Sequence, residues 1–565
     1  MSALNLLVFR GGQRHASGQE LKTALAERLR QLGSRCSQDA VIGALLLAGE
    51  LEGGMADADD ESARPVEVLT DRIADALLLG EAVSDFEILG RAARGVPIRE
   101  QLSISTPEGF AYYALHPLAY AEVLSHVSLS TNNLIIVGIR SIGTTLSAVT
   151  AAAARFHGMQ VQRITVRPQG HPYNRHTELL PRLLAIVQKA VSSGATFAIV
   201  DEGPGLSGSS FLSVAEALER AGAPRERVVL LSSYQPNVDM LCASDAASRW
   251  RRYQNVAVAA EARRPAHAVD FIGGGRWRSR LLNELEWPAA WTSFERLKYL
   301  SSMDHASADH SSTEHGEPRF YKFAGLGRYG DQVFEREQKV AAAGFGPHPR
   351  WESDGFVSYP WCSCQRASDS GMNSRPMSAS DLSQSVLERL AEYCAFRVRA
   401  LAVSLSDLNA LQQMAQHNLR ELGLDAPVDL RLEHPVIADG RMQPHEWLLM
   451  KDGQMLKTDS GSHGDDHFFP GPTDIAWDLA GAIVEWRMDQ QQAREFLDSY
   501  RRKSGDNASG RVDNFLKVYA VFRAAYSMMA ANALRGTEEQ ARLDRAAAGY
   551  EDFLMQLESR SLTAV

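Results

Sequence analysis

The sequence predicts an α/β fold in its first half, with a doubly wound parallel sheet, followed by an α+β domain with a helical carboxy-terminal lobe. Two observations predict the parallel sheet: short, almost wholly apolar segments recur from residue 133 onward, and amphipathic helical segments separate them. A third observation concerns the second half, where short strand-like segments precede a long, mostly helical stretch. The composition, 45% hydrophobic and 23% charged, excludes a fibrous or mainly disordered chain.

Residues 1–104 are expected to form a mainly helical region. Its first helix begins near residue 17, where Ser17 and Glu20 have the spacing of a capping box. The leucines that follow share one helical stripe: Leu21, Leu25, Leu29 and Leu32.

Residues 105–300 are expected to form the α/β domain. The predicted buried strands are the apolar segments 134–140, 160–166, 196–202 and 227–233. A helical face between two of these strands is formed by Phe211, Val214, Ala215 and Leu218. This alternation is typical of a parallel sheet with helices on its faces.

Residues 301–318 contain small, polar and histidine residues without apolar periodicity, and we interpret them as a linker between two halves. Beyond it, residues 319–565 open with strand-like segments at 320–324 and 356–361. A later helix is expected to end near residue 533, with one stripe made of Phe515, Val518, Tyr519 and Phe522.

The charge balance and the cysteine content restrict partners and location. Lys and Arg total 59 against 69 Asp and Glu, a net charge of -10, so we expect no nucleic-acid partner. No run of about 18 apolar residues occurs, so we expect no membrane segment. Five scattered cysteines do not suggest a disulfide framework, and we expect a cytoplasmic protein.

An acid pair and a small-residue turn follow the strand-like segment 196–200. Asp201 and Glu202 can accept hydrogen bonds from ribose hydroxyls or hold a hydrated Mg²⁺. The turn that opens the next helix, Ser207-Gly208-Ser209-Ser210, exposes backbone N–H groups suited to a phosphate. The alternative for the same residues is an ordinary turn and helix cap.

This arrangement resembles the type I phosphoribosyltransferases, over roughly residues 105–240. A second element of the resemblance is the loop 138–145, which is similar to the family's pyrophosphate-binding loop, and a third is the segment 167–176, at the position of its mobile catalytic loop. The spacer between the acid pair and the serine turn is one residue longer than is usual in the family.

The resemblance implies a transfer of ribose 5-phosphate from phosphoribosyl pyrophosphate, with Mg²⁺, to a small-molecule acceptor. It assigns Asp201, Glu202 and Arg175 to catalysis, with the two acids also serving as metal ligands. The implied substrate-binding residues are Arg140, Ser141, Gly143, Thr144, Ser207, Gly208, Ser209 and Ser210. For Arg175 the alternative is a solvated loop.

In the second half, Lys322 lies in a strand-like segment and Glu337 in a helical one, an arrangement that positions ATP phosphates in kinases. With the segments 439–449, 456–459 and 474–480, the order and spacing resemble the aminoglycoside phosphotransferase-like kinases. The resemblance implies Lys322, Glu337 and Asp459 as nucleotide-binding residues, with Glu446 and Asp459 as metal ligands and ATP as cofactor.

One departure from the kinase pattern concerns the catalytic base. Arg441 stands where the family has its catalytic Asp, and a guanidinium does not accept a hydroxyl proton. Asp439, two residues away, is the alternative base. We therefore favour a pseudokinase or altered nucleotide-binding lobe over an active kinase.

Two further loops contain chemistry-bearing residues. Residues 273–278, with three glycines, are interpreted as a basic surface loop, and an anion-binding turn is the alternative. Residues 463–467, with two histidines and two aspartates, are interpreted as a solvated acidic loop. The whole chain is predicted to be a phosphoribosyltransferase-like enzyme fused to a nucleotide-binding kinase-like module. The alternatives are a non-catalytic sensor of phosphoribosyl pyrophosphate or nucleotide, and a small-molecule kinase.

Overall fold

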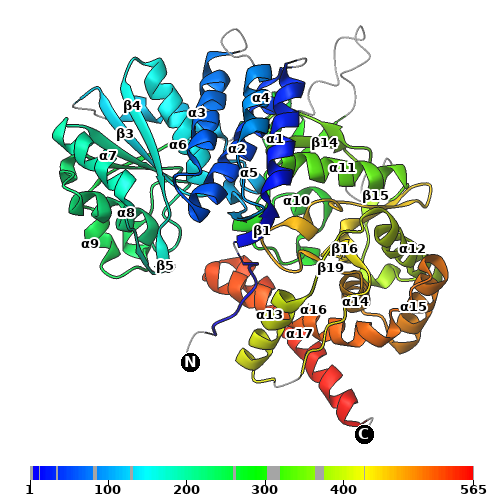
Figure 1. Cartoon of the computed structure of the whole chain (residues 1–565). Coiled ribbons are helices and arrows are strands. Elements are labelled where there is room, and N and C mark those ends of the chain that lie inside the picture. Colours follow the sequence, from blue (N-terminus) through cyan, green and yellow to red (C-terminus); the bar gives the residue numbers. More distant parts are fainter. Residues whose placement is uncertain are drawn as a thin grey trace.

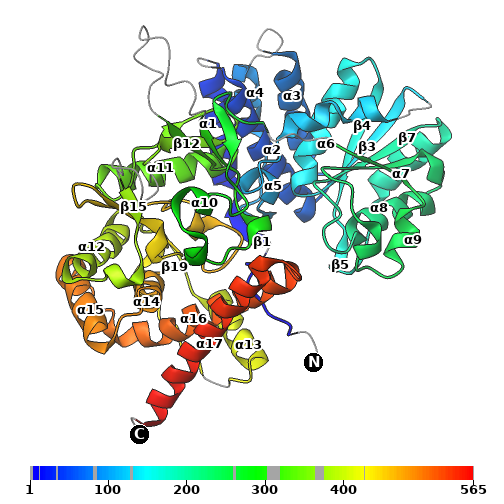
Figure 2. The same cartoon turned by 180° about the vertical axis from the view of Figure 1, so that it is seen from behind.

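The computed structural model describes residues 4–11, 13–33, 36–80, 86–127, 131–258, 263–301, 318–362, 374–424 and 427–563. Figures 1 and 2 show a helical amino-terminal region lying between a parallel sheet and the second half of the chain. A separate antiparallel sheet and a helical lobe make up that second half.

The amino-terminal region contains β1 (Gln13–Ser17), α1 (Gly18–Leu32), α2 (Gln38–Ala58), α3 (Arg64–Leu79), α4 (Phe86–Gly95) and β2 (Gln101–Ser105). Ser17 caps α1, because its hydroxyl accepts a hydrogen bond from the Glu20 N–H at 3.2 Å. The leucine stripe of α1 is buried against the other helices. Strands β1 and β2 pair antiparallel, so the two ends of this region meet.

The α/β part contains five parallel strands in the order β4-β3-β7-β8-β9. Its elements are α5 (Glu108–Ala111), β3 (Asn133–Ile139), α6 (Ile142–Phe156), β4 (Gln160–Val166), β5 (Gln169–His171), β6 (Asn174–His176), α7 (Pro181–Ser192), β7 (Thr196–Val200), α8 (Ser209–Arg220), β8 (Val228–Ser232), α9 (Ala246–Trp250) and β9 (Gln254–Ala257). Alternate residues of the strands pack into two hydrophobic cores, one on each face of the sheet. Ile136 and Val200 pack with α6, whereas Ile135 and Ile199 pack with α7 and α8. The predicted parallel sheet is confirmed, and it is covered on both faces.

The antiparallel sheet has the order β10-β11-β12-β14-β13. Its strands are β10 (Ala268–Phe271), β11 (Lys298–Ser301), β12 (Arg319–Phe323), β13 (Arg350–Trp351) and β14 (Phe356–Pro360), with α10 (Arg278–Leu281) after β10 and α11 (Arg328–Ala342) after β12.

This sheet crosses the boundary that the sequence suggested. Strands β10 and β11 belong to the segment 105–300, yet they pair in one sheet with β12, which belongs to 319–565. The segment 301–318 therefore joins two neighbouring strands, because Lys298 and Lys322 lie in register across them. Residues 302–317 of the expected linker lie outside the described residues.

The helical lobe contains β15 (Ser374–Pro376), α12 (Gln384–Ala400), α13 (Asn409–Glu421), β16 (Pro435–Ile437), β17 (Trp447–Met450), β18 (Met455–Lys457), β19 (Pro472–Asp474), α14 (Ala476–Glu485), α15 (Gln490–Ser504), α16 (Ser509–Ala533) and α17 (Glu538–Thr563). The predicted stripe of α16 is buried in the core of this lobe. Trp447, Trp477 and Trp486, all at most 1% exposed, lie in the same core.

Several contacts join the two halves into one structure. The Leu326 N–H donates to the Phe110 carbonyl at 2.9 Å, and the buried guanidinium of Arg296 donates to the carbonyls of Ala111 and Ala324 at 3.0 and 2.8 Å. The amino-terminal segment reaches the helical lobe, where the side chain of Asn418 bonds both backbone groups of Leu7. Experiments on either half therefore need the full chain.

None of the helices in the described ranges combines the length and the apolar character that crossing a membrane requires.

Candidate functional site

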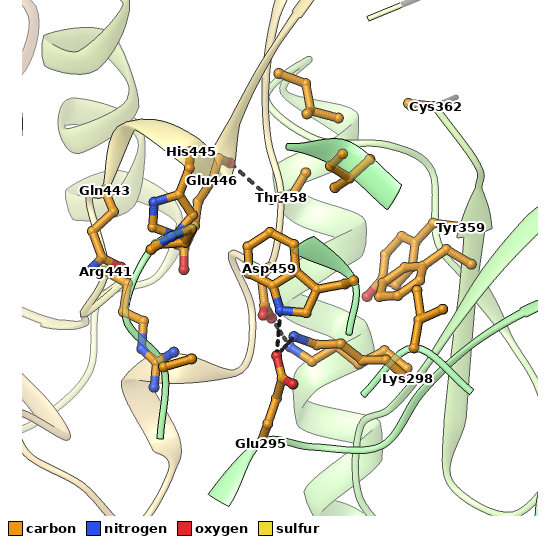
Figure 3. Close-up of a pocket in the computed structure, with 18 of the residues that line it drawn as sticks. Glu295, Lys298, Tyr359, Cys362, Arg441, Gln443, His445, Glu446, Thr458 and Asp459 are labelled. Carbon is orange, nitrogen blue, oxygen red and sulfur yellow. Dashed lines mark hydrogen bonds and ion pairs between the residues drawn. The ribbon is translucent and has the colours of Figure 1, made fainter. Parts of the chain in front are cut away.

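A cleft with a cavity of about 180 Å³ lies between the antiparallel sheet and the helical lobe (Figure 3). Much of its wall is aromatic, from Trp277, Trp291, Phe294, Phe320, Tyr359 and Trp361. Four cationic side chains, Lys298, Lys322, Arg441 and Arg523, also line it. Flat apolar walls beside fixed positive charges suit a ligand that combines an aromatic ring with anionic groups.

Lys322 lies on β12, the third strand of the sheet in chain order, and its side chain is 5% exposed. Its ammonium pairs with the carboxylate of Asp459 and donates to the Ser462 hydroxyl at 2.7 Å. The structure thus brings together two of the three predicted nucleotide-binding residues.

Glu337, the third of these residues, does not form the ion pair with Lys322 that the kinase-like pattern suggested. Its carboxylate accepts hydrogen bonds from the Gly461 N–H at 2.6 Å and from the Ser460 hydroxyl at 3.0 Å. Among the described ion pairs, Lys322 is joined to Asp459 and not to Glu337. Glu337 therefore holds the segment that follows Asp459, and its hydrogen bonds go to that segment.

The glycine-containing loop 273–278 faces the cleft. The Glu295 carboxylate accepts hydrogen bonds from the Gly275 N–H at 2.5 Å, the Trp277 indole at 2.8 Å and the Lys298 ammonium at 2.6 Å. Burial opposes ionisation, but Lys298 and the hydrogen bonds hold the pKa of Glu295 below its ordinary value. Three donors thus converge on the carboxylate of Glu295, and the alternative of an anion-binding turn at 273–278 stays a prediction.

Asp439 does not face the cleft as an alternative base would. It is fully buried, and its carboxylate accepts a hydrogen bond from the Tyr393 hydroxyl at 2.5 Å. The backbone N–H groups of Asp439 and Gly440 both donate to Asp478, at 2.8 and 3.0 Å. Asp439 is therefore a structural residue that fixes the backbone leading to Arg441. Figure 3 shows the Arg441 side chain on the cleft wall.

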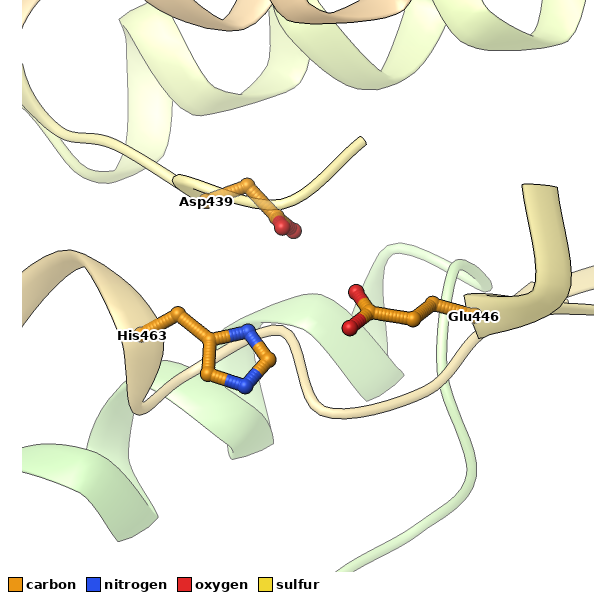
Figure 4. Close-up of side chains that lie close together, drawn as sticks. All are labelled: Asp439, Glu446 and His463. Atoms are coloured by element: carbon orange, nitrogen blue, oxygen red, sulfur yellow. The ribbon is translucent and has the colours of Figure 1, made fainter. Parts of the chain in front are cut away.

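The predicted metal ligands of the second half already have cationic partners. Glu446 accepts a hydrogen bond from the Lys457 ammonium at 2.8 Å, and Asp459 pairs with Lys322 and with the His463 ring at 3.0 Å. Figure 4 shows Asp439, Glu446 and His463 pointing toward one another, and their ligand atoms lie within 4.8 Å of one another. His463 is buried, which corrects the prediction of a solvated loop at 463–467.

In the first half, Asp201 and Glu202 lie directly after β7, as expected for a ligand site at the carboxyl end of a parallel strand. The Glu202 carboxylate accepts a hydrogen bond from the Gly109 N–H at 3.2 Å, and Tyr120 donates to the Asp201 carbonyl at 2.7 Å. Burial raises the pKa of Asp201 to about 7. Burial and the charge of Asp201 raise the pKa of Glu202 to about 8.

The serine turn precedes α8 and contacts the β5–β6 hairpin. The hydroxyls of Ser207 and Ser209 donate to the Pro172 carbonyl at 2.8 and 2.5 Å. Gly208 has a φ of 72°, a conformation that glycine adopts easily, and Ser210 lies in the first turn of the helix. Arg175 lies on this hairpin and donates to the Gly170 carbonyl at 2.8 Å. The hairpin thus lies over the turn, but Arg175 bonds within it.

The loop 138–145 differs from the expected pyrophosphate site. Arg140 is buried and bonds Asp60 at 2.7 Å and Asp57 at 3.3 Å, so its guanidinium serves an internal network and is not available to an anion. The acidic segment after α2 was the sequence signal for this network.

The other predicted residues of this loop are covered by α2. Ser141 has a φ of 103°, and a Cβ on Gly143 would lie 2.6 Å from the Val200 carbonyl. Thr144 is buried in the first turn of α6. A Cβ at Gly49 of α2 would lie 2.2 Å from the hydroxyl of the neighbouring Thr145, so glycine there allows α2 to approach the loop.

Sequence analysis missed two cleft residues, Glu295 and Lys298, and also Lys457, which lies beside the cleft. The available signal for Lys298 was the segment KYLS at 298–301, because alternating polar and apolar residues are typical of a strand. Lys457 and Glu295 had no comparable local signal, because a charged residue near an opposite charge in the sequence does not by itself indicate that the two are paired in the fold.

We expect the acid pair to make stability fall as pH rises from about 4 to about 8, because the folded chain holds protons that the unfolded chain releases. The double variant Asp201→Asn/Glu202→Gln should lack this decline and be at least about 2 kcal/mol more stable at pH 8 than the parent. Denaturant unfolding at pH 5 and pH 8 measures both effects.

Glu226→Gln, at an exposed position before β8, is the matched control and should leave the pH dependence unchanged. If the free energy of unfolding depends on pH in the same way in the double variant and the parent, the pKa values of Asp201 and Glu202 are not raised by folding.

Comparisons with known proteins give a limited likeness. No family model matches the chain, and no curated protein matches it. Among solved structures, the choline kinase LicA from Streptococcus pneumoniae is 12% identical and covers 45% of this chain and 89% of its own, with a TM-score of 0.28. A choline/ethanolamine kinase family protein from Mesorhizobium loti is 16% identical over 46% of this chain and 84% of its own, with a TM-score of 0.30. The GDP complex of aminoglycoside 2'-phosphotransferase-IIIa is 13% identical over 44% and 92%, with a TM-score of 0.28.

Proposed function

We propose that the cleft of the second half binds a nucleotide such as ATP, as a kinase-like module. The observation that carries this proposal is the buried ammonium of Lys322, on the third strand of the sheet, facing Asp459 in an aromatic cleft. Kinases use a lysine on the third strand, a glycine-rich loop over the phosphates and an acid opposite them. The glycine turn after the first strand, with its ring of donors, supports the same role.

In this proposal the phosphates lie against three of the four cleft cations, Lys298, Lys322 and Arg441, and the base lies against the aromatic wall. Glu295 occupies part of the anion position and leaves it when phosphate enters. Phosphate transfer is weak or absent, because Arg441 stands at the position of the base and Asp439 is buried. This favours an altered, pseudokinase-like site over an active small-molecule kinase.

A second candidate function concerns the first half: binding of phosphoribosyl pyrophosphate with Mg²⁺ at the acid pair. The observation that favours it is the half-buried pair Asp201 and Glu202 at the end of β7, beside the serine turn. Their raised pKa values reflect burial, which the charge of Arg167 offsets only in part at Asp201, and a bound Mg²⁺ would supply further positive charge. Arg140 is not part of this proposed binding site, because its guanidinium bonds Asp57 and Asp60.

Titration calorimetry on the full chain tests both functions. We expect ATP or ADP to bind, with no labelled γ-phosphate transferred to water or to a panel of small alcohols and amines. Robust transfer to a small molecule would instead support the small-molecule kinase.

In the same experiment, phosphoribosyl pyrophosphate with Mg²⁺ should bind to the parent and bind at least tenfold more weakly to Asp201→Ala/Glu202→Ala, a loss of about 1.4 kcal/mol or more. Release of pyrophosphate would distinguish an enzyme from a sensor. Equal affinity in the parent and the double variant would exclude this site.

A further inference from the structure

We infer that a side-chain ammonium, that of Lys457, takes the place of a divalent metal ion in the carboxylate cluster beside the cleft of the second half, so that nucleotide binding in the cleft does not require Mg²⁺. This inference rests on the proposed nucleotide-binding function. It concerns Asp439, Glu446 and His463, which converge as the ligands of a metal ion would (Figure 4).

Lys457 contacts two of these three residues, Glu446 and Asp439. Its ammonium lies 2.8 Å from a Glu446 carboxylate oxygen and 3.3 Å from an Asp439 oxygen, and it donates to the Thr458 carbonyl at 2.8 Å. The side chain is fully buried, so no water competes for its three N–H donors. Its geometry is that of a fixed internal cation.

A divalent ion does not fit beside this ammonium. Magnesium requires oxygen ligands at about 2.0–2.1 Å in an octahedral arrangement, and the same Glu446 carboxylate would have to serve both cations. A dication would also lie within a few ångströms of the Lys457 charge in a buried site, where repulsion is strong. Lys457 would therefore have to leave its three partners before a metal ion could bind.

The second predicted metal ligand is neutralised in the same way. Asp459 pairs with the ammonium of Lys322, and its other oxygen lies 3.0 Å from the His463 ring nitrogen. Both carboxylates that would carry magnesium thus face lysines from the chain itself. The cations that line the cavity and remain for the phosphates are Lys298, Lys322, Arg441 and Arg523.

The first test measures ADP binding by calorimetry to a full chain carrying Asp201→Asn and Glu202→Gln, which removes the metal-binding candidate of the first half. We expect the affinity in excess EDTA to be within about twofold of that in Mg²⁺. A weakening of tenfold or more in EDTA overturns the inference while leaving the proposed function intact. Absence of binding under both conditions contradicts the proposed function.

The second test needs no nucleotide and therefore separates the two conclusions. It measures Mn²⁺ binding by electron paramagnetic resonance in the same Asp201→Asn/Glu202→Gln chain. We expect no tightly bound Mn²⁺ with Lys457 present, and at least a tenfold gain in Mn²⁺ affinity in Lys457→Met, lost again when Glu446→Gln is added. Tight Mn²⁺ binding to the chain that retains Lys457, abolished by Glu446→Gln, overturns the inference.

Two control variants complete this test. Lys451→Met removes an exposed lysine from the turn between β17 and β18, and it should gain no Mn²⁺ site. Lys457→Arg retains a buried cation and should also gain none. A gain of equal size in Lys451→Met would show that the effect of Lys457→Met is not local, and it would count against the inference.

Discussion

Replacing Arg397 with methionine is expected to lower the free energy of unfolding by about 3–5 kcal/mol, the cost of leaving buried charges without their partner. Arg397 is fully buried on α12, and its guanidinium lies 3.6 Å from Asp439 and 3.5 Å from Asp478. It also donates to the Tyr393 hydroxyl at 2.7 Å and to the Ser460 carbonyl at 3.1 Å. Methionine has a similar length but satisfies none of these groups.

Denaturant unfolding of the full chain measures this loss. The matched control is Arg399→Met, two residues along α12, where the side chain is exposed and bonds the Lys503 carbonyl at 3.1 Å. That variant should lose less than about 1 kcal/mol, as is typical of surface positions. A loss of the same small size in Arg397→Met would mean that the buried carboxylates are neutral or solvated.

Replacing Lys322 with methionine is expected to weaken nucleotide binding by about 10- to 100-fold, since one charge-assisted contact to a phosphate contributes about 1.5–3 kcal/mol. The ammonium is held in place by Asp459 and Ser462, so it needs no reorganisation to meet the ligand. The methionine side chain preserves the packing of β12 while removing the charge.

Calorimetry of ADP binding to the full chain is the measurement. Lys339→Met is the control, because Lys339 lies on α11 in the same lobe but is exposed and pairs with Glu335 at 2.9 Å. It should bind ADP as the parent does. Undiminished ADP affinity in Lys322→Met would remove the cleft from the proposed function.

The acid pair and the serine turn could be predicted from the sequence because they are local features. Asp201 and Glu202 directly follow a strand that is buried along its whole length, and Ser207–Ser210 open the next helix. Residues close together in the sequence determine where a strand ends and where a helix begins. These positions can therefore be predicted without knowing the tertiary structure. The parallel sheet and the leucine stripe of α1 were predictable for the same reason.

The partners of the charged groups could not be predicted in this way, because each partner is chosen by proximity in space. Arg140 and Asp60 are 80 residues apart, and Lys322 and Ser462 are 140 residues apart. Every arginine, lysine, aspartate and glutamate is compatible with many such pairings in the sequence. Folding favours the pairings that offset the cost of burying these charges.

By itself, then, the sequence determined the strands of the parallel sheet, the helical stripes of α1 and α16, and where the acid pair and serine turn lie. Only the tertiary structure decided that Arg140 supports the fold, that Asp439 is buried and that β10 and β11 join the sheet of the second half. It also decided that Lys457 fills the carboxylate cluster beside the cleft. The physical reason is that periodicity is set by neighbouring residues, whereas burial and charge pairing are set by residues that only folding brings together.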